Sequence, residues 1–430
     1  MDRKIVGALL AFGALLVPLV VEPGPASVGL APGSGVARPA PGVSAVREAS
    51  LVSPPDTQYC ETNFGIACYQ PSQLQAAYDL SPLYAQGIDG SGETIVIVDP
   101  FGSPTISQDL HDFDRAFGLA DPPGFRTIQP AGAVPPYPAD PAGPQDRSAW
   151  ASETTLDVEW SHALAPGAAI LLVETPVPET EGVQGFPQIV AAENEVIDHH
   201  LGQVISQSFG ATEPTFPSGA IPGLRSAFVN AARHGVTVLA GSGDQGATGL
   251  LADQSCCYTT TVVDWPGSDP LVTAVGGTQL SLNDAGNRTA ADAVWNDTGL
   301  LGPGGGASGG GRSQLFGRPP YQDGVAGMVG DARGTPDISM SASVDGAVDT
   351  YSSFCNYSAI DPTTGTAPAC GPAWSLGSGT SEATPEFAGI VALADQAAGH
   401  PLGLLNRALY RLAARGAPGI VDVTGGDNSY

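Results

Sequence analysis

The sequence predicts an α/β protein with a doubly wound, mostly parallel sheet flanked by helices, in a single large domain. Short continuous apolar runs such as Thr94–Asp99 and Ala169–Glu174 are typical of strands buried on both faces of a parallel sheet. Segments with helical periodicity alternate with these runs, which is the order expected of βα units. The chain has 430 residues, enough for one large core of this kind.

The predicted elements follow one another along most of the chain, and order is expected to begin near Tyr59. The predicted helices are Gln73–Tyr84, Ser107–Phe117, Ala149–Leu164, Phe186–His200, Gly223–His234, a helix starting near Ser381, and Leu402–Ala414. The predicted strands are Thr94–Asp99, Ala169–Glu174, Gln203–Ser208, Val236–Ala240 and Pro270–Val275. A Pro-rich loop before Arg147, a turn at Gly276–Thr278 and a glycine-dense loop at Gly302–Gly311 complete the pattern.

The composition is strongly acidic and argues against two classes of partner. Acidic residues number 43 and basic residues 16, which gives a formal net charge of −27. Such a chain repels nucleic acid and anionic membrane surfaces. Its self-repulsion eases when carboxylates become protonated, which favours an acidic working environment.

The N-terminal segment indicates export. Arg3 and Lys4 precede an apolar run, Ile5–Val21, which small residues and prolines follow. We interpret residues 1–26 as a signal peptide and 27–55 as a leader or linker rich in Pro, Gly and Ala, so that the protein is expected to be secreted and extracellular. A retained membrane anchor is the alternative interpretation of the same run.

The cysteine content fits an oxidising compartment. Six cysteines in an exported chain suggest three disulfides. Two short loops offer natural pairs, namely Cys60 with Cys68 and Cys355 with Cys370. The adjacent Cys256 and Cys257 either bond to each other or pair elsewhere, and none of the six has the spacing of a metal site.

Ser381 is the first candidate for a reacting group. Gly377 and Gly379 allow a sharp turn just before it, and apolar residues then recur at helical spacing. Pro385 is expected in the first turn of that helix. A hydroxyl at a helix start meets the positive end of the helix dipole, which suits a nucleophile whose attack creates an oxyanion. An ordinary N-cap serine is the alternative interpretation.

Glu153 and Asp157 form the second candidate group. On a helix they share one face with Leu156, Trp160 and Leu164, so two carboxyls one turn apart lie on the apolar stripe of an amphipathic helix. Burial and mutual repulsion raise one pKa. The resulting carboxylate could take a proton from a serine hydroxyl while its neighbour orients it. The alternative is a helix whose polar boundary happens to carry acids.

Asp244 and Asp99 both follow predicted strands. Asp244 lies in the glycine loop Ser242–Ala247, where an Asx-turn role is the alternative to a functional one. Beside an oxyanion it helps only when protonated, as a hydrogen-bond donor. Asp99 occupies the place where a subtilisin carries its aspartate. None of the six histidines sits at a glycine-flanked helix start, which argues against Ser-His-Asp chemistry.

Together these motifs resemble the sedolisin family of serine-carboxyl peptidases. The motifs are Ser381 in Ser-Gly-Thr-Ser-x-x-x-Pro, Glu153-x-x-x-Asp157, and Asp244 in Ser-Gly-Asp-x-Gly-Ala. Supporting stretches are Val275–Leu280, Gly304–Gly311 followed by Pro320–Gln322, and Pro336–Ser339. The resemblance covers about residues 70–430 and implies a subtilisin-like fold. It also implies that Ser381 is the nucleophile, Glu153 the general base and then acid, Asp157 its orienting partner, and Asp244 the oxyanion donor.

Two features depart from the family pattern. Members usually carry a long folded prosegment, and few residues precede the expected peptidase domain, 56–430, in this chain. The family also has a calcium site near its C-terminal end. Asp422 and Val423 match its first half, and the chain as given stops before the second half, so a calcium site there is expected to be incomplete.

The sequence therefore predicts a secreted, acid-active endopeptidase that acts on protein or peptide substrates. It is expected to be a monomer that binds neither nucleic acid nor, after removal of the signal, a membrane. Two alternatives stay open. One is a non-catalytic secreted binding protein on a degenerate peptidase scaffold. The other is a subtilisin-type peptidase that uses Asp99 and an unrecognised histidine.

Overall fold

The computed structural model describes residue 51 and residues 53–135, 146–178, 185–252, 255–302, 305–354 and 373–430. For residues 146–148 it describes the backbone only. Three predictions therefore lie outside the described residues. They are the signal peptide 1–26, most of the leader 27–55, and the bridge between Cys355 and Cys370.

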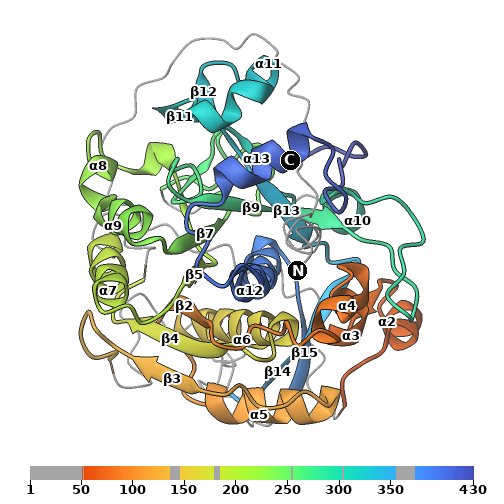
Figure 1. The fold of residues 1–430 in the computed structure, drawn as a ribbon. Coiled ribbons are helices and arrows are strands. Elements are labelled where there is room, and N and C mark those ends of the chain that lie inside the picture. Colours follow the sequence, from red (N-terminus) through yellow and green to blue (C-terminus); the bar gives the residue numbers. More distant parts are fainter. Residues whose placement is uncertain are drawn as a thin grey trace, which may run out of the picture.

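An eight-stranded sheet forms the centre of the described domain (Figure 1). Its strands lie in the order β10-β9-β7-β5-β2-β4-β3, and β13 also pairs with β9. Their bounds are β2 Thr94–Pro100, β3 Phe125–Ile128, β4 Ala169–Thr175, β5 Val204–Gln207, β7 Thr237–Gly241, β9 Thr273–Gln279, β10 Ala293–Val294 and β13 Ile338–Ser341. Every pairing is parallel except that of β10 with β9. This confirms the predicted doubly wound α/β fold.

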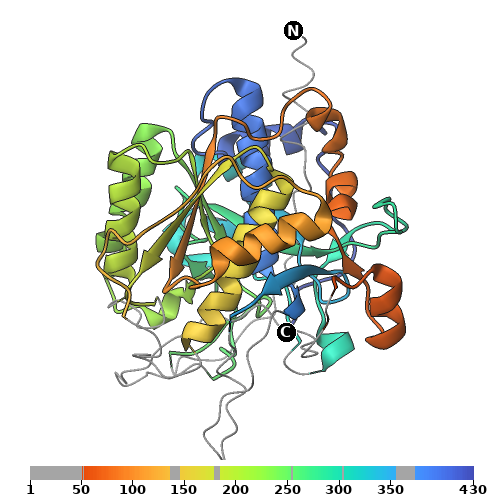
Figure 2. The same cartoon turned by 90° about the horizontal axis from the view of Figure 1, so that it is seen from below.

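Helices cover both faces of this sheet (Figures 1 and 2). The long ones are α5 Ile106–Phe117, α6 Asp146–Leu164, α7 Phe186–Asp198, α9 Ser226–His234, α12 Thr380–Ala398 and α13 Asn406–Ala414. Because successive side chains of a strand point to opposite faces of the sheet, β2 contributes residues to two hydrophobic cores. Ile95 and Ile97 pack in the core that contains α6 and α12, whereas Val96 and Val98 pack in the core that contains α7 and α9.

A small three-stranded sheet packs beside α5 and α6. It consists of β1 (Cys68–Tyr69), β14 (Ala347–Ser352) and β15 (Ala373–Gly377). Helix α6 is attached to β14 by two hydrogen bonds. Trp160 Nε1 donates to the Asp349 carbonyl at 2.8 Å, and the Tyr351 N–H donates to Glu159 at 3.0 Å. Strand β15 leads directly into α12.

Two of the expected disulfide arrangements can be checked. The predicted bridge between Cys60 and Cys68 is confirmed, with a Cα–Cα distance of 5.8 Å. It joins α2 (Thr57–Asn63) to β1. Cys256 and Cys257 bond to each other, which is one of the two arrangements that the sequence left open.

The remaining described elements are short and connect these parts. They are α3 Pro71–Ala77, α4 Ser81–Tyr84, β6 Ala211–Thr212, η2 Glu213–Thr215, α8 Ile221–Leu224, β8 Asp264–Trp265, α10 Thr298–Leu301, β11 Gly311–Gly317, η3 Pro320–Val325, α11 Ala326–Val329 and β12 Ala332–Thr335. Within the described residues, no helix combines the length and hydrophobicity needed to cross a bilayer.

Three predicted elements differ from the structure. The helix predicted over 73–84 is two helices, α3 and α4, because Asp79 between them has φ 55° and a helix cannot continue through that conformation. The helix predicted over 223–234 likewise divides into α8 and α9. The last helix begins at Asn406 and not at Leu402.

Two strand predictions were also wrong. Gly276 and Gly277 lie inside β9 and do not form a turn. A Cβ on Gly277 would come within 2.6 Å of Ala342 and of the Trp295 ring, so these glycines serve close packing across the strand. Strand β3 was missed within the predicted Pro-rich loop, because it is a short edge strand with two exposed residues and no apolar run.

Candidate active site

Ser381 lies at the start of α12, as predicted. The chain leaves β15, turns through Gly377–Gly379, and enters the helix at Thr380. Gly379 has φ 97°, a conformation that favours glycine. A Cβ on Gly377 would come within 2.7 Å of Leu156 on α6, so glycine lets the turn approach that helix closely. The Ser381 side chain is thereby buried at the mouth of the helix, beside a cavity.

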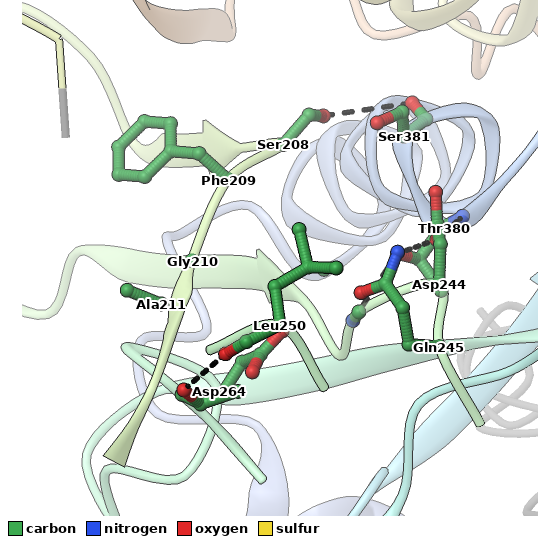
Figure 3. A pocket seen from close by; sticks show the side chains of 13 residues that line it. Ser208, Phe209, Gly210, Ala211, Asp244, Gln245, Leu250, Asp264, Thr380 and Ser381 are labelled. Carbon is green, nitrogen blue, oxygen red and sulfur yellow. Dashed lines mark hydrogen bonds between the residues drawn. The ribbon is translucent and has the colours of Figure 1, made fainter. Parts of the chain in front are cut away.

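Pro385 is the sixth residue of α12 and not part of its first turn, which corrects the prediction. Proline has no N–H, so it cannot donate to the Ser381 carbonyl one turn before it. The Ser208 hydroxyl, which donates its proton to Asp157, lies 3.5 Å from that carbonyl oxygen and makes a second, weaker contact with it (Figure 3). The proline thus leaves room for a contact between α12 and the residue that follows β5.

Glu153 and Asp157 both lie inside the protein on α6. Glu153 is 6% exposed and Asp157 is fully buried. Burial is the main cause that raises the pKa of each carboxyl well above its ordinary value, and a hydrogen bond with Ser381 partly offsets it for Glu153. The helix is not amphipathic as predicted, because it is buried on nearly all sides from Trp150 to Leu164. Both carboxyls are nevertheless turned inward, as expected.

Ser208 connects the two helices that carry the candidate residues. Its hydroxyl donates to Asp157 Oδ1 at 2.8 Å and also contacts the Ser381 carbonyl. It directly follows β5, at the carboxyl edge of the central sheet, which is where open α/β sheets place their sites. The hydroxyl fixes one oxygen of Asp157, so that carboxyl is held in one orientation next to α12.

Asp244 lies on the loop after β7 and is held by the first residue of α12. Its Oδ1 accepts hydrogen bonds from the Thr380 N–H at 2.9 Å and from the Thr380 hydroxyl at 2.8 Å (Figure 3). Burial raises the pKa of Asp244 to about 6, although both hydrogen bonds from Thr380 act to lower it. The carboxyl is therefore neutral in mildly acidic solution and can donate a hydrogen bond.

Asp99 adds a fourth buried carboxyl to this region. It lies at the carboxyl end of β2, and burial raises its pKa to about 7. Its charge in turn acts to raise the pKa values of Glu153 and Asp157. Like charges close together in a buried site repel one another, so the pKa values of the group are raised and its protons are retained to higher pH than in exposed carboxyls.

One cavity brings Ser381 and Asp244 together. Its lining residues come from the segment that follows β5, from β6 and β8, from the end of β7 and the loop after it, and from α12 (Figure 3). They are Ser208, Phe209, Gly210, Ala211, Thr212, Gly241, Gly243, Asp244, Gln245, Leu250, Asp264, Thr380 and Ser381. Glu153 and Asp157 do not line this cavity. Asp264 adds another acid to the wall, and burial raises its pKa to about 7.

The glycine-dense loop packs its backbone directly against the loop that carries Asp244. The Gly309 N–H donates to the Gly243 carbonyl at 2.7 Å, and the Ala307 N–H donates to the Asp244 carbonyl at 2.9 Å. A Cβ on Gly309 would collide with the Ser242 carbonyl. The prediction that this stretch lacks regular structure is confirmed for 305–310, whereas Gly311 begins β11.

The histidines do not approach Ser381. All six lie within the described residues, and none lines the cavity. Five are exposed. The sixth, His162, is buried and contacts Asp114 and the Ala120 carbonyl. The geometry therefore gives a subtilisin-type Ser-His-Asp arrangement no support.

The predicted calcium residues do not assemble a metal site in the described part of the chain. Asp422 is exposed, and Val423 packs against Val294. Asp427 uses its carboxylate to accept hydrogen bonds from Ser429. Among the described residues, no group of three or more His, Cys, Asp or Glu side chains is arranged to hold a metal ion. These residues do not fit the six or more oxygen ligands that calcium takes.

Several residues of this site were missed by sequence reasoning. Thr380 and Ser208 both hold a predicted residue in place, and Asp264 and Leu250 help to form the cavity. The position of Ser208 directly after a buried strand is a signal that could have identified it. Asp264 had no such signal, because its approach to Asp244 depends on how the loop after β7 folds back.

Comparison with known proteins places this chain in a family. A sequence model of the subtilase family matches residues 148–415. Kumamolisin from Bacillus sp. (strain MN-32) is 32% identical over 368 residues, which cover 84% of this chain and 57% of that protein. Sedolisin from Pseudomonas sp. (strain 101) is 30% identical over 368 residues, which cover 84% of this chain and 56% of that protein.

A third relative and a solved structure extend the comparison. Tripeptidyl-peptidase 1 of Canis lupus familiaris is 28% identical over 361 residues, which cover 83% of this chain and 57% of that protein. The chain thus spans little more than half of each of these three relatives. The structure of Pseudomonas sedolisin, a serine-carboxyl proteinase complexed with two molecules of pseudo-iodotyrostatin, has a TM-score of 0.67 and 28% identity. The aligned region covers 85% of this chain and 90% of the sedolisin chain.

Proposed function

Because the chain belongs to the subtilase family, and within it to the sedolisin family of serine-carboxyl peptidases, we propose that it is a serine-type endopeptidase acting through an acyl-enzyme on Ser381. One observation carries this proposal. The Ser381 hydroxyl lies close enough to the buried Glu153 carboxyl to act to lower its pKa, and it shares a cavity with a second carboxyl, Asp244, that can donate.

In the acylation step the Ser381 oxygen attacks the carbonyl carbon of the peptide bond. Its proton passes to Glu153, which acts as general base. The carbonyl oxygen becomes an oxyanion, and the protonated Asp244 carboxyl donates a hydrogen bond to it. Glu153 then gives the proton to the leaving amine, the C–N bond breaks, and the acyl group stays on Ser381.

Deacylation reverses these roles with water as the nucleophile. Glu153 takes a proton from the water, the oxyanion forms again beside Asp244, and the Ser381 oxygen leaves with the proton that Glu153 returns. Asp157 orients Glu153 and is itself held by Ser208. The starting enzyme is regenerated together with the carboxylic acid product.

We also propose that the activity is highest in acid. Glu153 works as a base only when the Glu153/Asp157 pair has lost one of its two protons. The first proton leaves more easily than the second, because the proton that remains is shared and the raised pKa belongs mainly to the second loss, so activity falls only at the acid end where the pair is fully protonated. Asp244 works as a donor only when it keeps its proton. With a pKa of about 6, it loses that proton toward neutral pH and activity falls again.

The setting follows from the same proposal. We propose that the protein is secreted, that it acts on proteins or peptides as a monomer, and that cleavage is internal to the substrate. Support for secretion comes from the N-terminal sequence, which lies outside the described residues. The relatives include a protein named tripeptidyl-peptidase, so the distinction between internal and terminal cleavage needs its own measurement.

A single experiment tests the proposed function. Denatured casein is incubated with the wild type and with Ser381→Ala between pH 3 and pH 8, and the fragments are sized and sequenced by mass spectrometry. We expect internal fragments below pH 6 from the wild type only. Equal cleavage by the variant would contradict the nucleophile assignment. Binding of casein without cleavage by the wild type would favour the non-catalytic scaffold.

A further inference from the structure

The segment Asp427–Tyr430 lies against the loops that form the candidate oxyanion hole. Its neighbours in sequence are exposed, but Asn428 is only 8% exposed. The Asn428 side-chain amide donates to the Ser308 carbonyl and to the Gly310 carbonyl, each at 3.2 Å. The backbone carbonyl of Asn428 accepts a hydrogen bond from the Ala247 N–H at 2.9 Å. One residue therefore links the glycine-dense loop to the Asp244 loop.

These two loops already depend on each other. Beyond the contacts described above, the Gly246 N–H donates to the Ala307 carbonyl at 2.9 Å, and the Ser242 hydroxyl donates to the Gly309 carbonyl at 2.7 Å. The Asp244 loop is thus bonded on one side to the glycine-dense loop. Asn428 is hydrogen-bonded to both loops. The segment Asp427–Tyr430, the glycine-dense loop and the Asp244 loop are therefore each bonded to the other two.

The packing between this segment and the Asp244 loop is close. Gly246 has φ 60°, and a Cβ added there would collide with the Asn428 carbonyl and lie 2.9 Å from the Tyr430 Cβ. Asn296 holds the segment from the other side, by donating to the carbonyls of Asp427 and Ser429. The Asp244 loop consequently has little room to shift while Asn428 is in place.

We propose that Asn428 is a positioning residue of the oxyanion hole. It holds the backbone of the Asp244 loop, while Thr380 separately orients the Asp244 carboxyl. This inference rests on the proposed peptidase function. A donor to an oxyanion works only when its place is fixed before the reaction, so loosening the loop weakens binding of the transition state more than binding of the substrate.

The test compares two peptide inhibitors that differ only in their terminal group, an aldehyde in one and an alcohol in the other. A peptide aldehyde forms a hemiacetal with a serine nucleophile, and its oxygen occupies the oxyanion position. The corresponding peptide alcohol binds the same cleft without bonding to serine. Inhibition constants for both, kcat, KM and Tm are measured on the full chain for the wild type, Asn428→Ala and Asn428→Asp. Ser429→Ala is the matched control in the same segment.

We expect both Asn428 variants to lose between about 10- and 100-fold in kcat, with a similar loss in aldehyde affinity, because a small misplacement has effects of that size. KM and alcohol affinity should stay within about twofold. Asn428→Asp keeps the volume of the side chain but lacks its N–H donors, so it separates the hydrogen bonds from packing. Ser429→Ala should resemble the wild type in every measurement.

Three outcomes would overturn the inference. A lower Tm with an unchanged ratio of aldehyde to alcohol affinity would assign Asn428 to stability alone. Failure of both variants to fold would do the same. If the wild type itself neither cleaves peptides nor binds the aldehyde more tightly than the alcohol, the proposed function fails and this inference fails with it.

Discussion

Two groups of buried carboxyls lie at the N-terminal part of α12, and only one of them is connected to Ser381. Glu153 and Asp157 reach α12 from α6 and are linked to it through Ser381 and Ser208. Glu382 and Glu386 belong to α12 itself and are fully buried. Glu386 accepts a hydrogen bond from Tyr78 at 3.2 Å, whereas neither carboxyl oxygen of Glu382 has a hydrogen-bond partner among the described residues.

Burial raises the pKa values of both groups well above the ordinary range. A raised pKa therefore reports the loss of water and does not by itself identify a reacting group. What distinguishes Glu153 is that the hydroxyl acting on its pKa, that of Ser381, borders a cavity. The comparison predicts that variants of the first group lose activity and that variants of the second group change stability.

The largest expected effect comes from Ser381→Ala. Removing the nucleophile of such a group costs about 10⁴–10⁶-fold in kcat, because no acyl-enzyme can form. Single-turnover cleavage of a chromogenic peptide at pH 4 measures it. Thermal unfolding at the same pH should be nearly unchanged, since only one oxygen is lost. A variant that retains more than about one hundredth of wild-type kcat would exclude Ser381 as the nucleophile.

Glu153→Gln should have the next largest effect. Glutamine keeps the shape of the side chain but cannot accept the proton from Ser381, so kcat should fall by about 10²–10⁴-fold. Glu382→Gln is the matched control, since it makes the same change in another buried glutamate close to Ser381 in sequence. Steady-state kinetics at pH 4 measures both. Equal losses in the two variants would remove the distinction between the two groups.

Asp244 should respond differently to two substitutions. Asp244→Ala removes the oxyanion donor and should cost about 10²–10³-fold in kcat. Asp244→Asn keeps an acceptor for Thr380 and a donor for the oxyanion, so the loss should be within about 10-fold. Because the amide does not titrate, the fall in activity near pH 6 should move to higher pH in Asp244→Asn. If the activity of Asp244→Asn still fell near pH 6, a group other than Asp244 would be responsible for the loss of activity toward neutral pH.

The smallest effect on activity is expected for Glu382→Gln and Glu386→Gln, which should instead alter stability. Tyr78, Ser341 and Asp297 face this pair, and Arg288 acts on it only through Tyr78. A raised pKa in the folded state means that stability is complete below the ordinary value of 4.5 and is lost as pH rises toward the folded value.

The amide variants cannot ionise, so they should unfold at a higher temperature than the wild type at pH 7 and at a similar temperature at pH 4. The expected gain at pH 7 is about 1–3 kcal/mol for each site. Calorimetry at both pH values measures it, and Glu195→Gln on the surface of α7 is the control. A loss of stability at pH 7 would mean that the pair is ionised and stabilised in the folded protein.

Much of the fold could be predicted from the sequence because its signals are local. The strands of the central sheet are continuous apolar runs, and Ser381 follows glycines that permit a turn. Glu153 and Asp157 are one helical turn apart, so their shared direction needs no tertiary information. The division of the helix predicted over 73–84 had a local signal that was missed, because Pro82 fits the first turn of a new helix and not the interior of a longer one.

The contacts that assemble the site could not be predicted in the same way. Ser208, Thr380 and Asn428 act on groups far away in the sequence, and their distances depend on how loops from different strands approach. The glycines at 305–310 indicated an irregular loop, but the sequence did not show which backbone segment they pack against. The roles of Asp422 and Val423 rested on resemblance alone, and the described residues give them no metal site.

The attachment of α6 and α12 to one small sheet has a further consequence. Trp160 and Glu159 fix α6 to β14, and β15, the partner of β14, continues into α12. Glu153 and Ser381 thus depend on one small sheet, and Thr380 ties Asp244 to the same helix as Ser381. When heat or a substitution loosens the small sheet, we expect all three side chains to lose their arrangement at once, so that the proposed proton transfer and oxyanion binding fail together.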